Sequence, residues 1–394
     1  MPGSVMVSFA RTPIGKLSGA LASCSAMDLG GRAIGAALER GGVGPDQVDY
    51  VIMGQVLQAG QGQITARQAA AQAGVPMSVP ALTVNKVCLS GLNAVYLADQ
   101  MIQAGDAEIV VAGGMESMTN APYLLPKARA GYRMGNGELV DALIQDGLWC
   151  AFDAVHMGAG TERYTGQFGG ITRAAQDELA ARSHERAAVA QKEGRFADEI
   201  TPVAIPQRKG DPIVVETDEG VRPETTAESL AALKPAFAPD GSITAGNASQ
   251  ISDGGAAVIV TSRSKAEELG LTPVAELVSF GMVAGPDTSL LRQPSRAIKR
   301  ALEPIDKTVA DLDLVEINEA FAAVGLASMK DLGVTDDIVN VNGGAIALGH
   351  PIGMSGTRVL LTLVNELRRR GGGLGAAALC GGGGQGDAAI VKVS

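Results

Sequence analysis

Cysteine is scarce in this sequence, and its scarcity limits both the compartment and the metal chemistry that we expect. Only four cysteines occur among 394 residues, and no two of them have CxxC spacing; they are Cys24, Cys88, Cys150 and Cys380. Such a set is too sparse for a disulfide framework and lacks the ligand spacing of a zinc site. We therefore expect a reducing compartment and no metal site.

Long basic runs and long apolar runs are missing as well. The formal net charge is −10 and no long Lys/Arg run occurs, which argues against a nucleic-acid or anionic-membrane surface. No apolar stretch reaches the roughly 20 residues that a membrane-spanning helix needs, and no basic and apolar leader precedes Val5–Phe9. The sequence thus predicts a soluble, cytoplasmic protein with no nucleic-acid or membrane partner. An anionic ligand would need a local basic or N–H-rich site.

Glycine and apolar residues, in contrast, are plentiful. Hydrophobic residues make up 46% of the chain, and glycine contributes 52 residues. This composition suits a compact α/β protein with tight loops, and the length permits two or more domains with cores of their own.

The chain contains an internal repeat. Residues 32–39, followed by Asp49-Tyr50-Val51, return as residues 296–303, followed by Asp313-Leu314-Val315 in the same register. Shorter matches extend the repeat: 7–9 with 278–280, 90–91 with 355–356, and 256–260 with 388–392. Self-similarity over this span indicates two duplicated halves.

Each half alternates short apolar segments with amphipathic ones. In the first half we expect strands at 49–56, 81–84, 108–112 and 256–261, and helices at 64–73 and 91–103. Such alternation predicts a mixed, mostly parallel sheet flanked by helices. A long stretch before the last strand carries an expected helix at 173–193 and a hairpin at 202–216, and long insertions in compact folds are usually functional. We therefore divide the chain into an N-terminal half (1–118 plus 250–270), an inserted loop domain (119–249) and a C-terminal half (271–394).

One cysteine stands where a strand, a tight turn and a helix are expected to meet. Cys88 lies between the apolar run 81–84 and the helical segment 92–103. The positive end of a helix favours thiolate over thiol and so raises nucleophilicity. Cys88 is therefore our candidate nucleophile; the alternative is a small buried hydrophobic residue.

Six motifs spread over nearly the whole chain decide between these alternatives. They are NKVCLSG (85–91), GGMESM (113–118), HMG (156–158), NEAFA (318–322), GGAIALGHPIG (343–353) and CGGGGQG (380–386). Together they resemble the motifs of the thiolase family. The resemblance implies a duplicated αβαβα layered sandwich whose inserted loop domain covers the substrate and binds coenzyme A.

The resemblance also implies roles for the catalytic residues. Cys88 would attack an acyl thioester and carry the acyl group, with His350 as its base, and Cys380 would exchange a proton with the carbon next to the thioester carbonyl. Asn318 would hold a water that forms one oxyanion hole with His350, while the backbone N–H groups of Cys88 and Gly382 would form the other. From the residues alone, His350 could instead be a structural histidine, and Asn318 a helix N-cap.

Further residues match the family's ligand contacts. Arg222 and Ser229 correspond to nucleotide contacts of coenzyme A, although a surface arginine is more often merely solvated. Ser249 corresponds to a pantetheine contact. His156, Met157 and Phe321 would line the pantetheine and acyl pocket, and the HMG motif is the short-chain form of this site.

Two segments depart from the short-chain pattern. Residues 284–292 replace the usual Tyr-Met-Gly segment and Gly-Pro-rich turn, which leaves one wall of the acyl pocket open to question, and Thr161-Glu162-Arg163 replaces a commoner Thr/Ala-Glu-Asn. The resemblance implies an enzyme that joins two acetyl-CoA molecules or splits acetoacetyl-CoA, with coenzyme A thioesters as substrates and no other cofactor. A 3-ketoacyl-CoA thiolase of fatty-acid β-oxidation with longer-chain preference is the alternative. A decarboxylating synthase and a non-catalytic acyl-CoA carrier fit the motifs less well.

The assembly is predicted from the inserted segment 123–148. It carries Tyr123, Leu124, Leu125, Tyr132, Met134, Leu139 and Leu143 outside the repeated halves. So much apolar surface must pack on its own domain or on another subunit. The resemblance favours a homotetramer built as a dimer of dimers; the alternative is a dimer whose inserted segment covers the active site.

Overall fold

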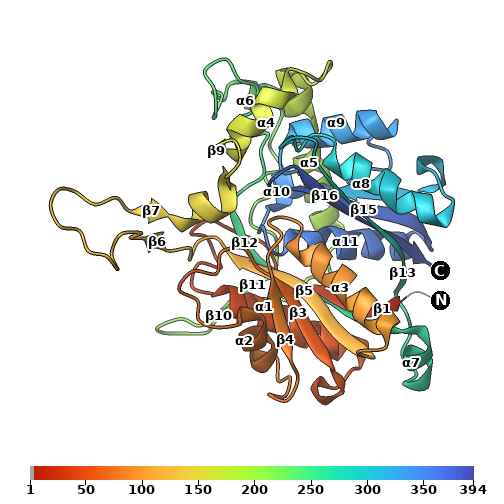
Figure 1. Ribbon diagram of the computed structural model, residues 1–394. Helices are drawn as coiled ribbons and strands as arrows, with labels where there is room; N and C mark the ends of the chain where they lie inside the picture. Colours follow the sequence, from red (N-terminus) through yellow and green to blue (C-terminus); the bar gives the residue numbers. More distant parts are fainter. Residues whose placement is uncertain (1–3) are drawn as a thin grey trace.

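A long sheet built from two equivalent halves forms the framework of the protein (Figure 1). The computed structural model describes residues 4–394. In the N-terminal half the strand order is β4 (Ala81–Val84), β3 (Tyr50–Gly54), β5 (Ile109–Ser117), β12 (Ser252–Ser262) and β1 (Ser4–Arg11), with the short β2 (Gly15–Lys16) beside β12. In the C-terminal half it is β14 (Leu314–Ile317), β15 (Gly373–Gly381), β16 (Gln385–Val393) and β13 (Ala275–Ala284). Antiparallel pairing of β1 with β13 joins the halves, and the matching strand orders confirm the duplication.

The sheet is mixed, but the prediction that it is mostly parallel is wrong. Only β3 with β4, β3 with β5, and β14 with β15 pair in parallel, whereas β1, β12, β13 and β16 run antiparallel to their neighbours within residues 4–394. The last two strands of the C-terminal half follow each other through the short turn 382–384, where Gly383 and Gly384 have positive φ values of 77° and 67°. A hairpin of this kind makes an antiparallel pair and needs no crossover helix.

Helices form three layers around the two sheet halves. α1 (Ala26–Gly41) and α2 (Thr65–Gln72) pack on the outer face of the N-terminal half, and α8 (Gln293–Leu302) and α9 (Ala322–Leu332) on the outer face of the C-terminal half. α3 (Ser90–Ala104) and α11 (Ser355–Arg369) contact each other between the halves (Figure 1). This arrangement is the expected αβαβα sandwich.

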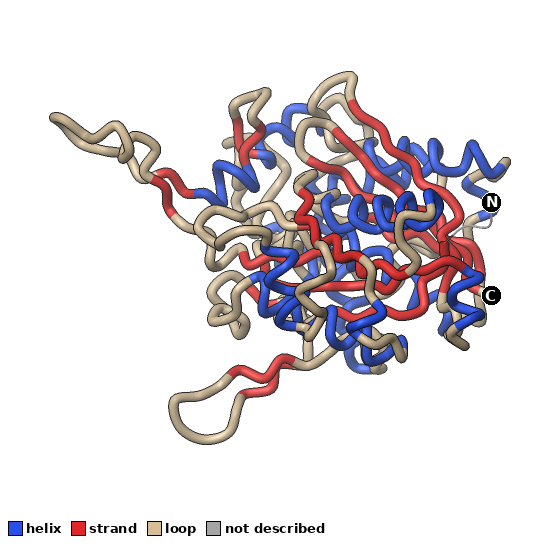
Figure 2. Tube along the Cα trace, turned by 60° about the horizontal axis from the view of Figure 1, so that its bottom comes forward, coloured by secondary structure: helices blue, strands red, loops and turns tan. Residues whose placement is uncertain are grey.

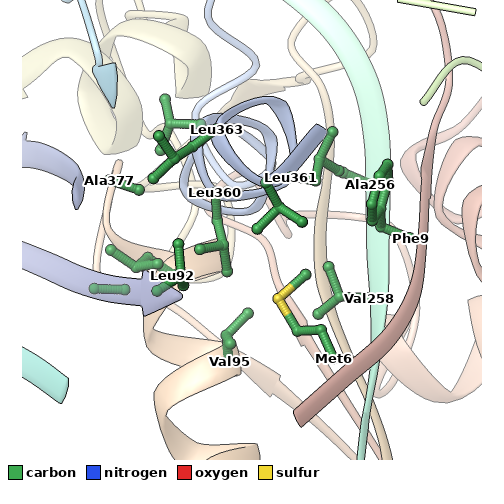
Figure 3. Packing of buried hydrophobic residues seen from close by; sticks show 14 of the residues in the cluster. Met6, Phe9, Leu92, Val95, Ala256, Val258, Leu360, Leu361, Leu363 and Ala377 are labelled. Atoms are coloured by element: carbon green, nitrogen blue, oxygen red, sulfur yellow. The ribbon is translucent and has the colours of Figure 1, made fainter. Parts of the chain in front are cut away.

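The central helix layer holds the largest core. Leu92 and Val95 of α3 and Leu360 of α11 are at most 1% exposed and lie among Met6 of β1 and Val258 of β12 (Figure 3). Each fully buried side chain of this size contributes about 1.5–3 kcal/mol relative to an exposed one. Because the loops that carry Cys88 and His350 lead into α3 and α11, this core fixes the site's two halves relative to each other.

The repeat explains why equivalent helices cover equivalent faces. In α1 the buried positions include Ala33, Ile34, Ala37 and Leu38, and in α8 they include Ala297, Ile298, Ala301 and Leu302. These sets have the i, i+1, i+4, i+5 spacing of one helix face. A Ser25–Asp28 capping box starts α1, and Gly42 ends it at φ 64°.

Most of the remaining elements belong to segment 119–249. They are β6 (Tyr123–Leu124), β7 (Val140–Asp141), the π-helical turn Leu143–Leu148, β8 (Trp149–Cys150), β9 (Val155–His156), α4 (Met157–Thr165), α5 (Arg173–Lys192), β10 (Val203–Ile205), β11 (Ile213–Val215) and α6 (Ala227–Ala231). Two arms project from the body, one at β6–β7 and one at β10–β11 (Figure 2). The predicted helix 173–193 and hairpin 202–216 are confirmed, while the exact domain boundaries stay a prediction.

Two short helices complete the fold, α7 (Arg263–Glu268) and α10 (Ala345–Leu348), together with 3₁₀ turns at Pro45–Gln47, Glu303–Ile305 and Val309–Asp311. Across residues 4–394, no helix combines the length and the apolar character needed to cross a membrane.

Candidate active site

The predicted nucleophile stands on a tight, hydrogen-bonded turn. β4 ends at Val84 and α3 begins at Ser90, so Cys88 lies just before the first helical turn. The Ser90 hydroxyl accepts the N–H of Lys86 at 2.8 Å and donates to the carbonyl of Val87 at 2.6 Å. Val87 adopts φ 52°, a left-handed conformation that costs a β-branched residue on the order of 1–3 kcal/mol. The strand–turn–helix prediction is thus confirmed, and the turn is strained beside the thiol.

His350 is brought to this thiol from the other half of the chain. It follows Gly349, whose φ of 112° favours glycine, and its Nε2 atom lies 3.2 Å from the Cys88 Sγ atom. Its Nδ1 atom lies 2.6 Å from the Ser355 Oγ atom, and the Ser355 hydroxyl donates to the Pro351 carbonyl at 2.8 Å. Since that hydroxyl hydrogen is used, Nδ1 must donate to Ser355, which leaves the Nε2 lone pair facing Cys88. Sequence reasoning missed this role of Ser355, although the repeat pairs it with Ser90.

Desolvation favours the neutral form of both members of this pair. It raises the pKa of the Cys88 thiol to about 12, and burial together with the nearby Arg358 guanidinium lowers the pKa of His350 to about 3. Desolvation thus opposes the stabilisation of the thiolate that the helix N-terminus is expected to give, and that expectation stays a prediction. The thiol needs a base, and a neutral imidazole is suited to accept its proton.

Cys380 approaches from the end of β15. It is 1% exposed, and burial, with the nearby Cys88 as a second cause, raises the pKa of its thiol well above its usual range. The next residue but one, Gly382, leads into the glycine turn. A Cβ atom at Gly382 would lie 3.4 Å from a methyl of Val87. The loop after Cys380 therefore packs directly on the turn that carries Cys88.

Asn318 lies beside the imidazole. Its Nδ2 atom is 3.3 Å from His350 Nε2, and its backbone N–H donates to Ala378 at 3.0 Å. Its buried Oδ1 atom has no hydrogen-bond partner among the described residues, and such an acceptor invites a donor such as water. The N-cap alternative for Asn318 is wrong, because α9 begins at Ala322 with Phe321 in the cap position.

Two buried glutamates from the motifs brace the surrounding loops. Glu116 of GGMESM accepts the backbone N–H groups of Val56, Leu57 and Gly353 at 3.0, 3.1 and 2.9 Å, which ties the loop after His350 to the N-terminal half. Burial raises its pKa to about 7. Glu319 of NEAFA accepts from Ser183 at 2.7 Å and Asn340 at 2.8 Å. These glutamates hold the loops around the site, and, in addition to burial, the Glu116 carboxylate lies close enough to Cys88 to raise the pKa of its thiol.

A pocket of about 660 Å³ opens beside this cluster. Its lining includes Val87, Cys150, Phe152, Met157 and Gly382, so it reaches both the Cys88 turn and the glycine loop after Cys380. A second cavity of about 340 Å³ lies between α5 and α9 and contains none of the cysteines and no histidine. The first pocket is therefore the one suited to deliver a substrate to the thiols.

The predicted acyl-pocket residues form an aromatic row with one unforeseen member. The His156 ring stacks on Phe237 at a centroid distance of 4.7 Å, and Phe237 meets Phe321 edge to face at 6.3 Å. Met157 packs in the same apolar cluster as Phe321 and Cys380. Phe237 was missed, since a lone aromatic residue in a loop gives no positional signal.

The predicted coenzyme A contacts are more dispersed. Ser249 is held next to Phe321, because its N–H donates to Ala320 at 3.0 Å. The Arg222 side chain lies 3.1 Å from the His184 Nε2 atom. Ser229 is exposed and closes a capping box with Thr226 at the start of α6. Arg222 and Ser229 are not among the residues that line the 660 Å³ pocket.

The structure shows the contacts of the two segments that depart from the short-chain pattern. In 284–292, Thr288 bonds to Asp153 and to the Tyr164 hydroxyl, and Leu290 and Leu291 are buried in the cluster that contains Cys380. These leucines pack in the apolar core beside Cys380 but are not among the residues that line the 660 Å³ pocket. Glu162 accepts the N–H groups of Ser242 and Ile243 at 2.8 and 2.9 Å and so supports α4.

Comparisons with known proteins concern the family and the fold. Residues 4–264 match the family description "Thiolase, N-terminal domain" and residues 271–393 match "Thiolase, C-terminal domain". The chain is 60% identical over 388 residues to the "Probable acetyl-CoA acetyltransferase" of Mycolicibacterium smegmatis, covering 98% of this chain and 100% of the relative. It is 55% identical over 393 residues to the "Acetyl-CoA acetyltransferase" of Cupriavidus necator, covering 100% of both. The crystal structure of the Bacillus anthracis acetyl-CoA acetyltransferase superposes with a TM-score of 0.97 at 42% identity, covering 100% of this chain and 99% of that one.

Proposed function

This chain belongs to the thiolase family, and from that premise we propose how its residues carry the reaction, the reversible condensation of two acetyl-CoA molecules to acetoacetyl-CoA and CoA. The observation that carries the proposal is the 3.2 Å contact between Cys88 Sγ and His350 Nε2, with the tautomer fixed through Ser355. Close relatives named acetyl-CoA acetyltransferase favour this activity over long-chain degradation.

In the first half-reaction the acetyl group moves to the enzyme. His350 takes the thiol proton as Cys88 Sγ attacks the carbonyl carbon of acetyl-CoA, and the negative charge collects on the carbonyl oxygen. The backbone N–H groups of Cys88 and Gly382 would donate to that oxygen. Losing one such preorganised donor typically costs about 10²- to 10³-fold in rate. The tetrahedral adduct then expels the CoA thiolate, which takes the proton held by His350.

In the second half-reaction a carbon–carbon bond forms. Cys380 first passes its thiol proton to His350, which is neutral again once CoA has left, and the Cys380 thiolate then removes a proton from the methyl carbon of a second acetyl-CoA. The enolate oxygen would be stabilised by His350 and by a water held at Asn318, whose buried Oδ1 atom is unpartnered in the described structure. The enolate carbon attacks the acetyl carbonyl on Cys88, and the Cys88 sulfur leaves with the pair of electrons of the broken S–C bond and takes the proton from His350, which returns both cysteines to thiols. Reversal of these steps splits acetoacetyl-CoA.

Coenzyme A thioesters are the substrates, and the chemistry needs no further cofactor. We place the pantetheine arm along Ser249 and the aromatic row of His156 and Phe321, with the nucleotide toward Arg222 and Ser229. Because Cys88 and Cys380 must both be thiols, the proposal includes a reducing, cytoplasmic compartment. All four cysteines are free, which fits that setting.

Chain-length preference tests the substrate assignment. Because Leu290, Leu291, Met157 and Phe321 fill the space around Cys380, kcat/KM for thiolysis should be highest with acetoacetyl-CoA and fall with longer 3-ketoacyl-CoAs. One methylene in a hydrophobic pocket typically changes this ratio by about 10- to 200-fold. Steady-state thiolysis across a homologous series measures it. A rate that holds steady or rises with chain length would favour the degradative 3-ketoacyl-CoA thiolase.

For assembly we propose a homotetramer. The arm at β6–β7 (Figure 2) exposes Tyr123 at 64%, Met134 at 95% and Leu139 at 62% of their surfaces, and the edge strand β4 exposes Leu82 at 41%. An apolar arm and an unpaired sheet edge both favour contact with another subunit. A dimer of dimers needs two different contact surfaces, and the β6–β7 arm and the β4 edge provide two.

The tetramer is tested by light scattering at micromolar concentration. We expect a mass of four chains, and a dimer for a variant in which Met134 and Leu139 are replaced by serine. A wild-type mass of one or two chains that does not rise with concentration would contradict the tetramer and leave the arm as a cover for the pocket.

A further inference from the structure

An ion pair joins the turn that carries Cys88 to the opposite half of the protein. The Lys86 ammonium lies 2.8 and 2.9 Å from the two carboxylate oxygens of Asp387, a residue 301 positions away. The pair is largely enclosed, with the Lys86 and Asp387 side chains 22% and 5% exposed. Ion pairs that are shielded in this way are screened less by salt than surface pairs.

Both partners are next to catalytic positions in the fold. Lys86 precedes Cys88 by two residues. Asp387 lies on β16 opposite Leu379 of β15, and the next pair in the register is Gly386 with Cys380. The ion pair therefore connects the loop that carries Cys88 to the pair of strands, β15 and β16, that carries Cys380.

The turn needs outside support because it is strained. Val87, between Lys86 and Cys88, has φ 52°, and strained backbone persists only where its surroundings determine it. The hydrogen bonds of Asn85 and Ser90 act within the turn itself. They shape it but do not fix its distance from the C-terminal half.

We propose that Lys86 and Asp387 are positioning residues, which hold the Cys88 turn in register with the Cys380–Gly382 loop so that the Cys88 and Gly382 N–H groups face one carbonyl oxygen. This inference rests on the proposed function. Neither side chain is assigned a contact with substrate, so their effect reaches the reaction through the placement of Cys88.

The first test removes the pair in three ways. Lys86→Met keeps the length of the side chain without its charge, and Asp387→Asn keeps the shape without the charge. We expect each variant, and the double variant, to lose about 10- to 100-fold in kcat, as small misplacements of reacting groups do. KM for acetyl-CoA should stay near the wild-type value, because the proposed coenzyme A contacts lie elsewhere.

The double variant separates positioning from the cost of a lone enclosed charge. If the single variants lost activity only because one charge was left unpaired, removing both charges would restore it. A double variant with wild-type kcat would therefore overturn the proposal. A double variant as slow as the singles supports it.

Lys86→Arg provides the rescue, since a guanidinium can still meet the Asp387 carboxylate. It should keep kcat close to wild type, and a loss equal to that of Lys86→Met would overturn the proposal. Glu276→Gln is the matched control, because it breaks the Arg263–Glu276 pair of 2.9 Å, which is on the surface and distant in sequence from the cysteine loops. This variant should leave kcat unchanged.

Peptide mapping of the acetylated wild-type enzyme is carried out in parallel with these assays. If the wild-type enzyme carried no acetyl group on Cys88, the proposed function would be rejected, independently of the kinetics of the Lys86 and Asp387 variants.

Discussion

Replacement of Cys88 by serine should lower acetyl transfer by about 10⁴-fold or more, as the loss of a nucleophile does in other covalent enzymes. The serine hydroxyl would still meet His350, but a hydroxyl is far less acidic than a thiol and a weaker nucleophile toward the thioester. Steady-state thiolysis of acetoacetyl-CoA measures the loss.

The control for this variant is Cys24→Ala, which removes a buried cysteine that packs with Leu21, Leu29 and Val203, away from His350. It should retain wild-type turnover. A Cys88→Ser enzyme within tenfold of wild type, folded to the same degree, would mean that the acetyl group does not pass through residue 88.

Replacement of Cys380 by serine should separate the two half-reactions. Its thiol handles the carbon-bound proton, so condensation should fall by about 10²- to 10⁴-fold, the usual contribution of a positioned acid or base. Acetylation of Cys88 should proceed close to the wild-type rate, because His350 and Cys88 are untouched. Rapid-quench mixing with acetyl-CoA measures acetyl-enzyme and acetoacetyl-CoA in the same samples.

The pattern across the two products decides the role of Cys380. Acetyl-enzyme that accumulates without product is the expected result. Condensation near the wild-type rate would make Cys380 a structural residue, and loss of acetylation together with condensation would place it in the first half-reaction.

The repeat is the part of the fold that could be predicted most fully from the sequence. Residues 32–39 and 296–303 put the same apolar positions on α1 and α8, and helix spacing alone shows which face is buried. Strand direction is a different matter. An antiparallel partner such as β16 follows from a short glycine turn, and alternation of strands with helices does not reveal it.

In the site, too, features that depend on neighbouring residues could be predicted from the sequence, and features that depend on residues far apart in the chain could not. The turn at Cys88 is local and was predicted, whereas the neutral thiol depends on burial by residues far along the chain. Ser355 and Phe237 were missed because their partners, His350 and His156, become neighbours only after folding. The Lys86–Asp387 pair, with 301 positions between its partners, gives no sequence signal at all.

Direct mapping of the acetyl group on the wild-type enzyme tests the central assignment, a Cys88 thiol activated by His350. The enzyme is mixed with acetyl-CoA, quenched in acid and digested, and the peptides are sequenced by mass spectrometry. The account predicts one acetyl group per chain, on the peptide that contains Cys88, and its loss in a His350→Ala variant. An acetyl group on Cys380 or Cys150, or undiminished labelling of Cys88 without His350, would contradict it.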